Sequence, residues 1–196
     1  GVTPAAEEQS IYVNIQAGVV ADKATNPNTL SDTLTFIFDA TAPVPTLTTA
    51  EALTTKVSPL VMTVTFTEGV KNLALSHFTV TNCNTQNLAA VSGNGASGAP
   101  YTQDFTVFPR IYTFELVPLT ENFVTVQMPV SQVQDEATNL NSASTLITFL
   151  FDTTNPLVAV INSPSVTYTK TAPIAVVIDF NEAAYNFVVG DIGILP

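Results

Sequence analysis

The chain has 196 residues, of which 16 are acidic and 5 basic, so that its net charge is −11 and charged residues make up only 11%. Such a surface would repel a phosphate backbone or an anionic membrane, which argues against nucleic acid as a partner. No apolar run reaches the roughly 18 residues of a membrane span, which argues against membrane insertion. Cys83 is the only cysteine, so burial rather than a disulfide within the chain must supply the stability.

Apolar and polar residues alternate along most of the chain and helical periodicity is absent, which predicts an all-β protein. In the N-terminal part, residues 1–42, two runs have this pattern. Ile11, Val13 and Ile15 form the apolar face of the first run. The second run presents Leu34, Phe36 and Phe38 in the same way.

The central part, residues 43–155, has enough runs for about seven strands, which fit a two-sheet sandwich. The runs lie at 45–49, 60–66 and 76–81, in two or three stretches between 87 and 117, and at 122–128 and 144–151. Because side chains alternate between the two faces of a strand, one set is expected in the core. That set is Met62, Val64, Phe66, Phe78, Val80, Tyr112, Phe114, Leu116, Val124, Val126, Met128, Ile147, Phe149 and Phe151.

The C-terminal part, residues 156–196, completes an out-of-phase repeat. Residues 11–43 match residues 124–156 at an offset of about 113. Residues 173–182 match residues 59–68 at an offset that is one residue larger. We therefore expect one complete unit flanked by the last strands of one partial unit and the first strands of another. The ends lack a counterpart of roughly residues 85–115, so neither end buries its own apolar face. Repeat arrays of this kind are typical of proteins that are elongated or that assemble.

The segments VTPAAE, VADKATNPNTLSDTLTFIFDATAP and VTFTEGV resemble the tandem bacterial immunoglobulin-like domains of large surface adhesins. In that family a strand ending in an F-D-x-T-x-P linker recurs between domains. The resemblance covers essentially the whole chain, but Thr138 and Leu140 stand where such domains often carry glycine, and the stretch NTQNLAAVSGNGASGAPYTQ looks like an insertion. It implies immunoglobulin-like sandwiches, an extracellular or cell-surface location and a structural role; fold alone gives no ligand.

Carboxylates are expected to gather where one unit joins the next. In a seven-strand sandwich, the turn after the second strand and the turn before the last strand lie at the same end as the entry linker. This places Glu68 and Asp135 beside Asp39, with Asn139 nearby. Carboxylate and amide oxygens are hard ligands of the type that Ca²⁺ takes, which predicts calcium at the junction.

The following junction repeats part of this set. Asp152 and Glu182 take the places of Asp39 and Glu68, and Asp22 occupies the position of Asp135 in the preceding unit. The alternative is that each aspartate caps a turn through its own backbone and that Glu68 is simply solvated.

Other motifs give no catalytic site. GNGASG at 93–98 fits the G-x-G-x-x-G string, but no helix pattern follows it, which favours a surface loop. His77, expected to point outward from a strand, and Cys83 have no partners for a triad or an activated thiolate. We therefore expect no enzyme.

Taken together, the sequence predicts a segment of an extracellular rod or filament whose copies join head to tail. Residues 1–42 of one copy would pack with residues 157–196 of another, or the units would be joined in one longer polypeptide. The alternative is an adhesin whose loop at 85–104 recognises a glycan or a protein. Rows of threonine would be covered by O-linked sugars or neighbouring chains, or would reflect ordinary β-propensity.

Overall fold

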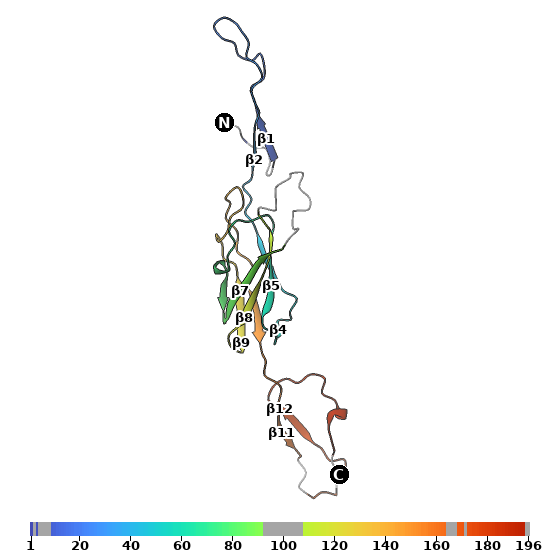
Figure 1. Cartoon of the computed structure of the whole chain (residues 1–196). Helices are drawn as coiled ribbons and strands as arrows, with labels where there is room; N and C mark the ends of the chain where they lie inside the picture. The colour runs from blue at the N-terminus through green and yellow to red at the C-terminus, as the bar shows by residue number, and fades with distance from the viewer. Residues whose placement is uncertain (2, 4–8, 92–107, 164–167, 171, 195–196) are drawn as a thin grey trace. The chain divides into compact units, whose positions relative to one another are not determined.

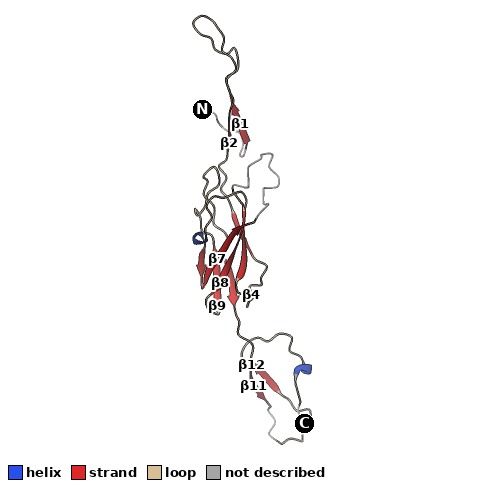
Figure 2. Cartoon of the chain, viewed as in Figure 1, coloured by secondary structure: helices blue, strands red, loops and turns tan. Residues whose placement is uncertain are grey.

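A computed structural model describes residues 1, 3, 9–91, 108–163, 168–170 and 172–194. The chain divides into two compact units, Gly1–Asp152 and Thr153–Pro196, which are considered separately (Figure 1). Strands account for nearly all regular structure of the described residues, interrupted by two 3₁₀ turns, η1 (Leu75–His77) and η2 (Val189–Asp191) (Figure 2). The all-β prediction is confirmed. No helix in the described part has the length and apolar character needed to cross a bilayer.

The first unit begins with an antiparallel hairpin of β1 (Gln9–Val13) and β2 (Leu34–Phe38). Ile11 lies opposite Phe36 in this pair, so the two side chains share a face. The long connection is folded around the Asn28 side chain, whose Oδ1 accepts the N–H groups of Val19 and Val20, both at 3.0 Å.

Two four-stranded sheets follow in the same unit. The first has the order β3 (Pro45–Thr48), β5 (Leu60–Phe66), β8 (Ile111–Pro118) and β7 (Cys83–Ala90). The second has the order β4 (Thr54–Thr55), β10 (Ile147–Phe151), β9 (Asn122–Gln127) and β6 (Thr79–Thr81). Every pair is antiparallel except β4 with β10. We call these eight strands the central sandwich.

The two sheets enclose one apolar core. Strand β5 contributes four buried side chains to it at alternate positions, as the period of a strand requires. Phe78 stacks on Phe114 with ring centroids 4.3 Å apart. Most of the predicted core positions are buried, while Val80, Ile147 and Phe151 pack against the core only partly buried.

Two sequence expectations for this unit were wrong in detail, and one strand was not predicted. The run 76–81 begins as η1, where the half-buried His77 accepts the N–H of Ala74 on Nδ1 at 3.2 Å instead of pointing outward from a strand. The last strand begins at Ile147, because before it the Ser144 hydroxyl accepts the N–H of Met128 at 2.9 Å. Strand β4 was not foreseen, since two residues show no alternation.

The second unit contains the antiparallel pair β11 (Val158–Asn162) and β12 (Val177–Phe180), followed by η2. Phe180 and Phe187 meet edge to face with centroids 5.3 Å apart. The pairing register shifts between Val158 and Val160, which marks a bulge.

Both ends of the chain have the same strand pairing as parts of the central sandwich. Ile11 pairs with Phe36 as Val124 pairs with Phe149, an offset of 113 residues. In the second unit Ile161 pairs with Ile178 as Leu47 pairs with Val64, an offset of 114. The bulge in β11 lies where the offset changes, because it inserts one residue into that strand. Turn η2 likewise follows η1 at 114.

Candidate metal centre

Three carboxylates meet in the first unit. Asp39 follows β2, Glu68 follows β5, and Asp135 lies in the connection between β9 and β10. One ligand oxygen from each lies within 4.8 Å of the others. Asp39 and Glu68 are half-buried and Asp135 is buried. The structure thus brings together the three residues that the sequence placed at the first junction.

Asn139 fixes the Asp135 carboxylate. Its backbone N–H donates to Oδ1 of Asp135 and its side-chain Nδ2 to Oδ2, both at 2.9 Å. The turn between them requires Thr138 to adopt φ 76°, a left-handed conformation that is uncommon for a β-branched residue.

Asn139 also connects this loop to the linker, because Nδ2 donates to the backbone carbonyl of Asp39 at 3.2 Å. The amide nitrogen therefore faces both aspartates. Through these bonds Asn139 positions the Asp135 carboxylate and holds it near the linker.

The turn that carries Glu68 is fastened to the Asp135 loop by Lys71. Its backbone N–H donates to the carbonyl of Gln134 at 2.8 Å, and its Nζ donates to the carbonyl of Glu136 at 3.1 Å. Gly69 has no room for a side chain, since a Cβ there would collide with the Phe108 carbonyl oxygen. Sequence reasoning missed both residues, although a glycine directly after the FTE motif is a local signal of close approach.

Asp22 shows the Asp135 geometry in the N-terminal hairpin. The N–H and Nδ2 of Asn26 donate to its Oδ1 and Oδ2 at 2.9 and 3.0 Å. These bonds, the side-chain bond from Asn26 foremost, hold the pKa of Asp22 below its ordinary value of 3.8. The carboxylate is exposed.

The remaining predicted ligands do not complete a set. Asp152 follows β10 in the first unit and Glu182 follows β12 in the second. Oε1 of Glu182 is buried and has no hydrogen-bond partner among the described residues. In the described ranges, no group of three metal-binding side chains includes Asp22, Asp152 or Glu182.

The chemistry of the first set suits a hard cation. Three carboxylates in one place repel one another, and a divalent ion would relieve that repulsion. Ca²⁺ takes about 6 to 8 oxygens, so carbonyls or water would have to complete the shell. Turn capping, the alternative expectation, is present as well, since Oδ1 of Asp39 accepts the N–H of Thr41 at 2.9 Å. Capping therefore orients the Asp39 carboxylate.

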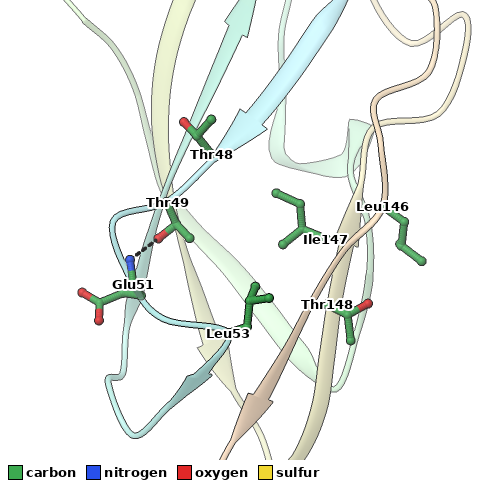
Figure 3. A pocket seen from close by; sticks show the side chains of 7 residues that line it. All are labelled: Thr48, Thr49, Glu51, Leu53, Leu146, Ile147 and Thr148. Carbon is green, nitrogen blue, oxygen red and sulfur yellow. Dashed lines mark hydrogen bonds between the residues drawn. The ribbon is translucent and has the colours of Figure 1, made fainter.

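A separate groove of about 540 Å³ opens between β3 and β10 (Figure 3). β10 pairs with β4 only at Leu150 and Phe151, so its first residues have no strand on that side. Among the described residues that line the groove, Glu51 is the one ionisable group, and no nucleophile lies with a base. The groove is lined by Thr48, Thr49, Glu51, Leu53, Leu146, Ile147 and Thr148.

Only the first part of the stretch proposed for ligand recognition lies among the described residues. Residues 83–90 form β7, so the start of the stretch 85–104 is a strand and not a loop. GNGASG and the rest of that stretch from residue 92 lie outside the described residues.

Comparison of the chain with models of known families, with curated proteins and with solved structures found no match in any of the three.

Proposed function

We propose that the chain is a non-enzymatic, structural segment of an extracellular rod or filament built from tandem immunoglobulin-like sandwiches. One observation carries this proposal: both ends of the chain have the pairing registers of the central sandwich, at offsets of 113 and 114 residues. A unit repeated along a chain makes contact chiefly with its neighbours and so builds length.

The strand order supports an immunoglobulin-like topology. When the strands of the central sandwich are lettered in chain order, with the short β4 as an addition to the first strand, the sheet β3-β5-β8-β7 becomes A-B-E-D. The other sheet, β4-β10-β9-β6, contains G-F-C with the short β4 at its edge. The immunoglobulin constant-type fold has the same two sets of strands, ABED and CFG, which supports the proposal.

Calcium at the junction is part of the proposal. An ion held by Asp39, Glu68 and Asp135 would join the linker to two turns of the following sandwich, and would restrict bending there. In the repeat, Asp152 and Glu182 correspond to Asp39 and Glu68, and Asp22 corresponds to Asp135.

Immunogold labelling tests the location and form of the native material. An antibody raised against the central sandwich should label filaments on the outside of unpermeabilised source cells. Label confined to the cell interior would refute the structural proposal. Label on isolated surface particles, together with loss of attachment when residues 92–99 are deleted, would favour the adhesin instead.

A further inference from the structure

A groove opens between β3 and β10 of the central sandwich (Figure 3). We propose that it binds an extended, cationic peptide strand of a partner protein. The peptide would pair with the free edge of β10 and continue the line of β4 along it. The lining comes from the stretches 48–53 and 146–148, in the interior of the chain. The inference goes beyond the proposed rod or filament and does not depend on it.

Strand β10 has a free edge beside the groove. Leu150 donates its N–H to the carbonyl of Leu53 at 2.7 Å, on the side where β4 pairs with β10. Because successive N–H groups of a strand point to opposite sides, the N–H of Thr148 points to the same side as that of Leu150. In the described part of the chain, β10 pairs on this side only at Leu150 and Phe151. The backbone of Thr148 is therefore open to pairing with another strand.

The groove also offers apolar contacts for the side chains of an added strand. Ile147 packs against the core and is only partly buried, while Leu53 is 66% exposed. Figure 3 shows both side chains pointing into the same space, one from β10 and one from the connection between β3 and β4. Side chains of an added strand that lie on the same face as Ile147 would fill this space.

The exposed leucines of the lining are not required by the strand pairing. At the offset of 113 residues, Thr33 stands at the position of Leu146. At the offset of 114, Thr167 stands at the position of Leu53. The core position of Ile147 remains apolar in the repeat. Leucine exposed where the repeat has threonine indicates a contact surface that belongs to the central sandwich.

Charge determines which strand the groove favours. Glu51 is the one charged residue of the lining, and its N–H donates to Oγ1 of Thr49 at 3.2 Å, which holds the turn after β3. With a net charge of −11, the chain repels an acidic strand or a second copy of itself and attracts a cationic strand. Since only alternate side chains of a paired strand would face Ile147, we expect a partner in which apolar and basic residues alternate.

Synthetic peptides added to the full chain test the proposal. Acetyl-Lys-Val-Lys-Val-Lys-Val-Lys-amide should bind in calorimetric titration. The same composition in the order Lys-Lys-Val-Val-Val-Lys-Lys should bind about tenfold more weakly or less, because its valines cannot all face the groove. An alternating Glu-Val peptide should not bind. In hydrogen exchange, the alternating lysine peptide should newly protect the Thr148 amide, whereas the Phe149 amide, which faces β9, should be protected throughout.

Variants of the full chain separate the groove from general charge attraction. Leu53→Asn removes an apolar side chain from the groove at constant charge and should weaken binding of the alternating lysine peptide about tenfold. Leu119→Asn, at a residue 59% exposed directly after β8 and outside the lining, is the matched control and should bind as the wild type does. Thr148→Pro removes the edge N–H where an edge strand tolerates proline, and should also weaken binding. The melting transition of the central sandwich should be unchanged in the two asparagine variants.

Three results would overturn the proposal: no binding of the alternating lysine peptide, equal binding of the two lysine peptides, or equal affinity of the Leu53→Asn and Leu119→Asn variants. Self-association of the chain that Leu53→Asn abolishes would also overturn it, because the groove would then hold a second copy. The proposed function would survive each of these results, since a rod needs no peptide in this groove. Labelling inside the cell would refute the proposed function without affecting the peptide titration.

Discussion

At the scale of single residues, the two aspartate–asparagine pairs show how one local motif serves two environments. Asp22 with Asn26 and Asp135 with Asn139 have the same pair of hydrogen bonds. Among the acceptors in the described residues, Asn139 has a further one, the Asp39 carbonyl, and Asn26 does not. The motif therefore closes its own loop in both places, and at Asn139 it also contacts the linker.

The Asp22 carboxylate gives a test of this local order. Its folded pKa is lowered, chiefly by the Asn26 side chain, so its stabilising effect is complete above the ordinary value of 3.8 and is lost as pH falls through the folded pKa. NMR titration should find the pKa of Asp22 below 3.8, and Asn26→Ala should raise it. An unchanged pKa in that variant would show that the amide does not hold the carboxylate.

Phe149 tests the assignment of the core. Phe149→Ala should lower the free energy of unfolding of the central sandwich by about 3 to 5 kcal/mol, because it removes a fully buried ring and leaves a cavity. Phe123→Ala, on the neighbouring strand β9 with an exposed ring, is the matched control and should cost much less. Denaturant unfolding of both variants measures the difference. Equal losses would contradict the core assignment.

Core residues of this kind were predictable because side chains alternate between the two faces of a strand, so that buried positions recur at every second residue. Met62, Val64 and Phe66 are buried as the alternation required. His77 was not predictable in the same way: its position depends on a 3₁₀ turn closed by its own side chain. A contact between a side chain and the nearby backbone leaves no periodic pattern in the sequence.

At the scale of elements, the connection between β9 and β10 is organised by one buried amide. Asn141 accepts the N–H groups of Gln132 and Val133 at 2.7 and 2.8 Å, and donates to the carbonyls of Pro129 and Ser142. These bonds therefore hold the base of the loop that carries Asp135 together, just beyond β9.

Asn141→Ala should consequently destabilise the sandwich strongly, since each buried group left unpaired costs about 1 to 3 kcal/mol. Asn28→Ala removes the matching amide in the exposed N-terminal loop and should leave the unfolding of the central sandwich nearly unchanged. Thermal unfolding followed by circular dichroism compares the two. Comparable shifts of the melting temperature in the two variants would mean that burial of the amide does not determine how much its loss destabilises the protein.

The order of elements was predictable where alternation and turns recur, but their pairing geometry was not. Strand β4 pairs in parallel with β10 over two residues, which is too short to leave a pattern. The change of repeat offset was visible in the sequence, whereas its cause, a bulge between Val158 and Val160, required the backbone. The meeting of Asp39, Glu68 and Asp135 was predictable because it follows from which ends of a sandwich face the linker.

At the scale of the whole molecule, charge and assembly are connected. The net charge of −11 opposes contact between copies, and the carboxylates at the proposed junctions concentrate part of that charge where units meet. A cation bound at each junction would offset this local repulsion. We therefore expect calcium to act on stiffness and assembly more than on the fold of one sandwich.

Calcium should raise the melting temperature of the full chain, and EDTA should lower it, because a ligand that binds only the folded state stabilises that state. Small-angle scattering should show a stiffer particle with calcium, since the ion would join the linker at Asp39 to the turns at Glu68 and Asp135. Glu68→Gln removes one charged ligand at nearly constant shape and should weaken both effects. Glu51→Gln changes a carboxylate in the groove between β3 and β10, away from the junction, and should leave both effects intact. If calcium and EDTA give identical scattering and melting curves, the carboxylates only cap their turns and the junction holds no ion.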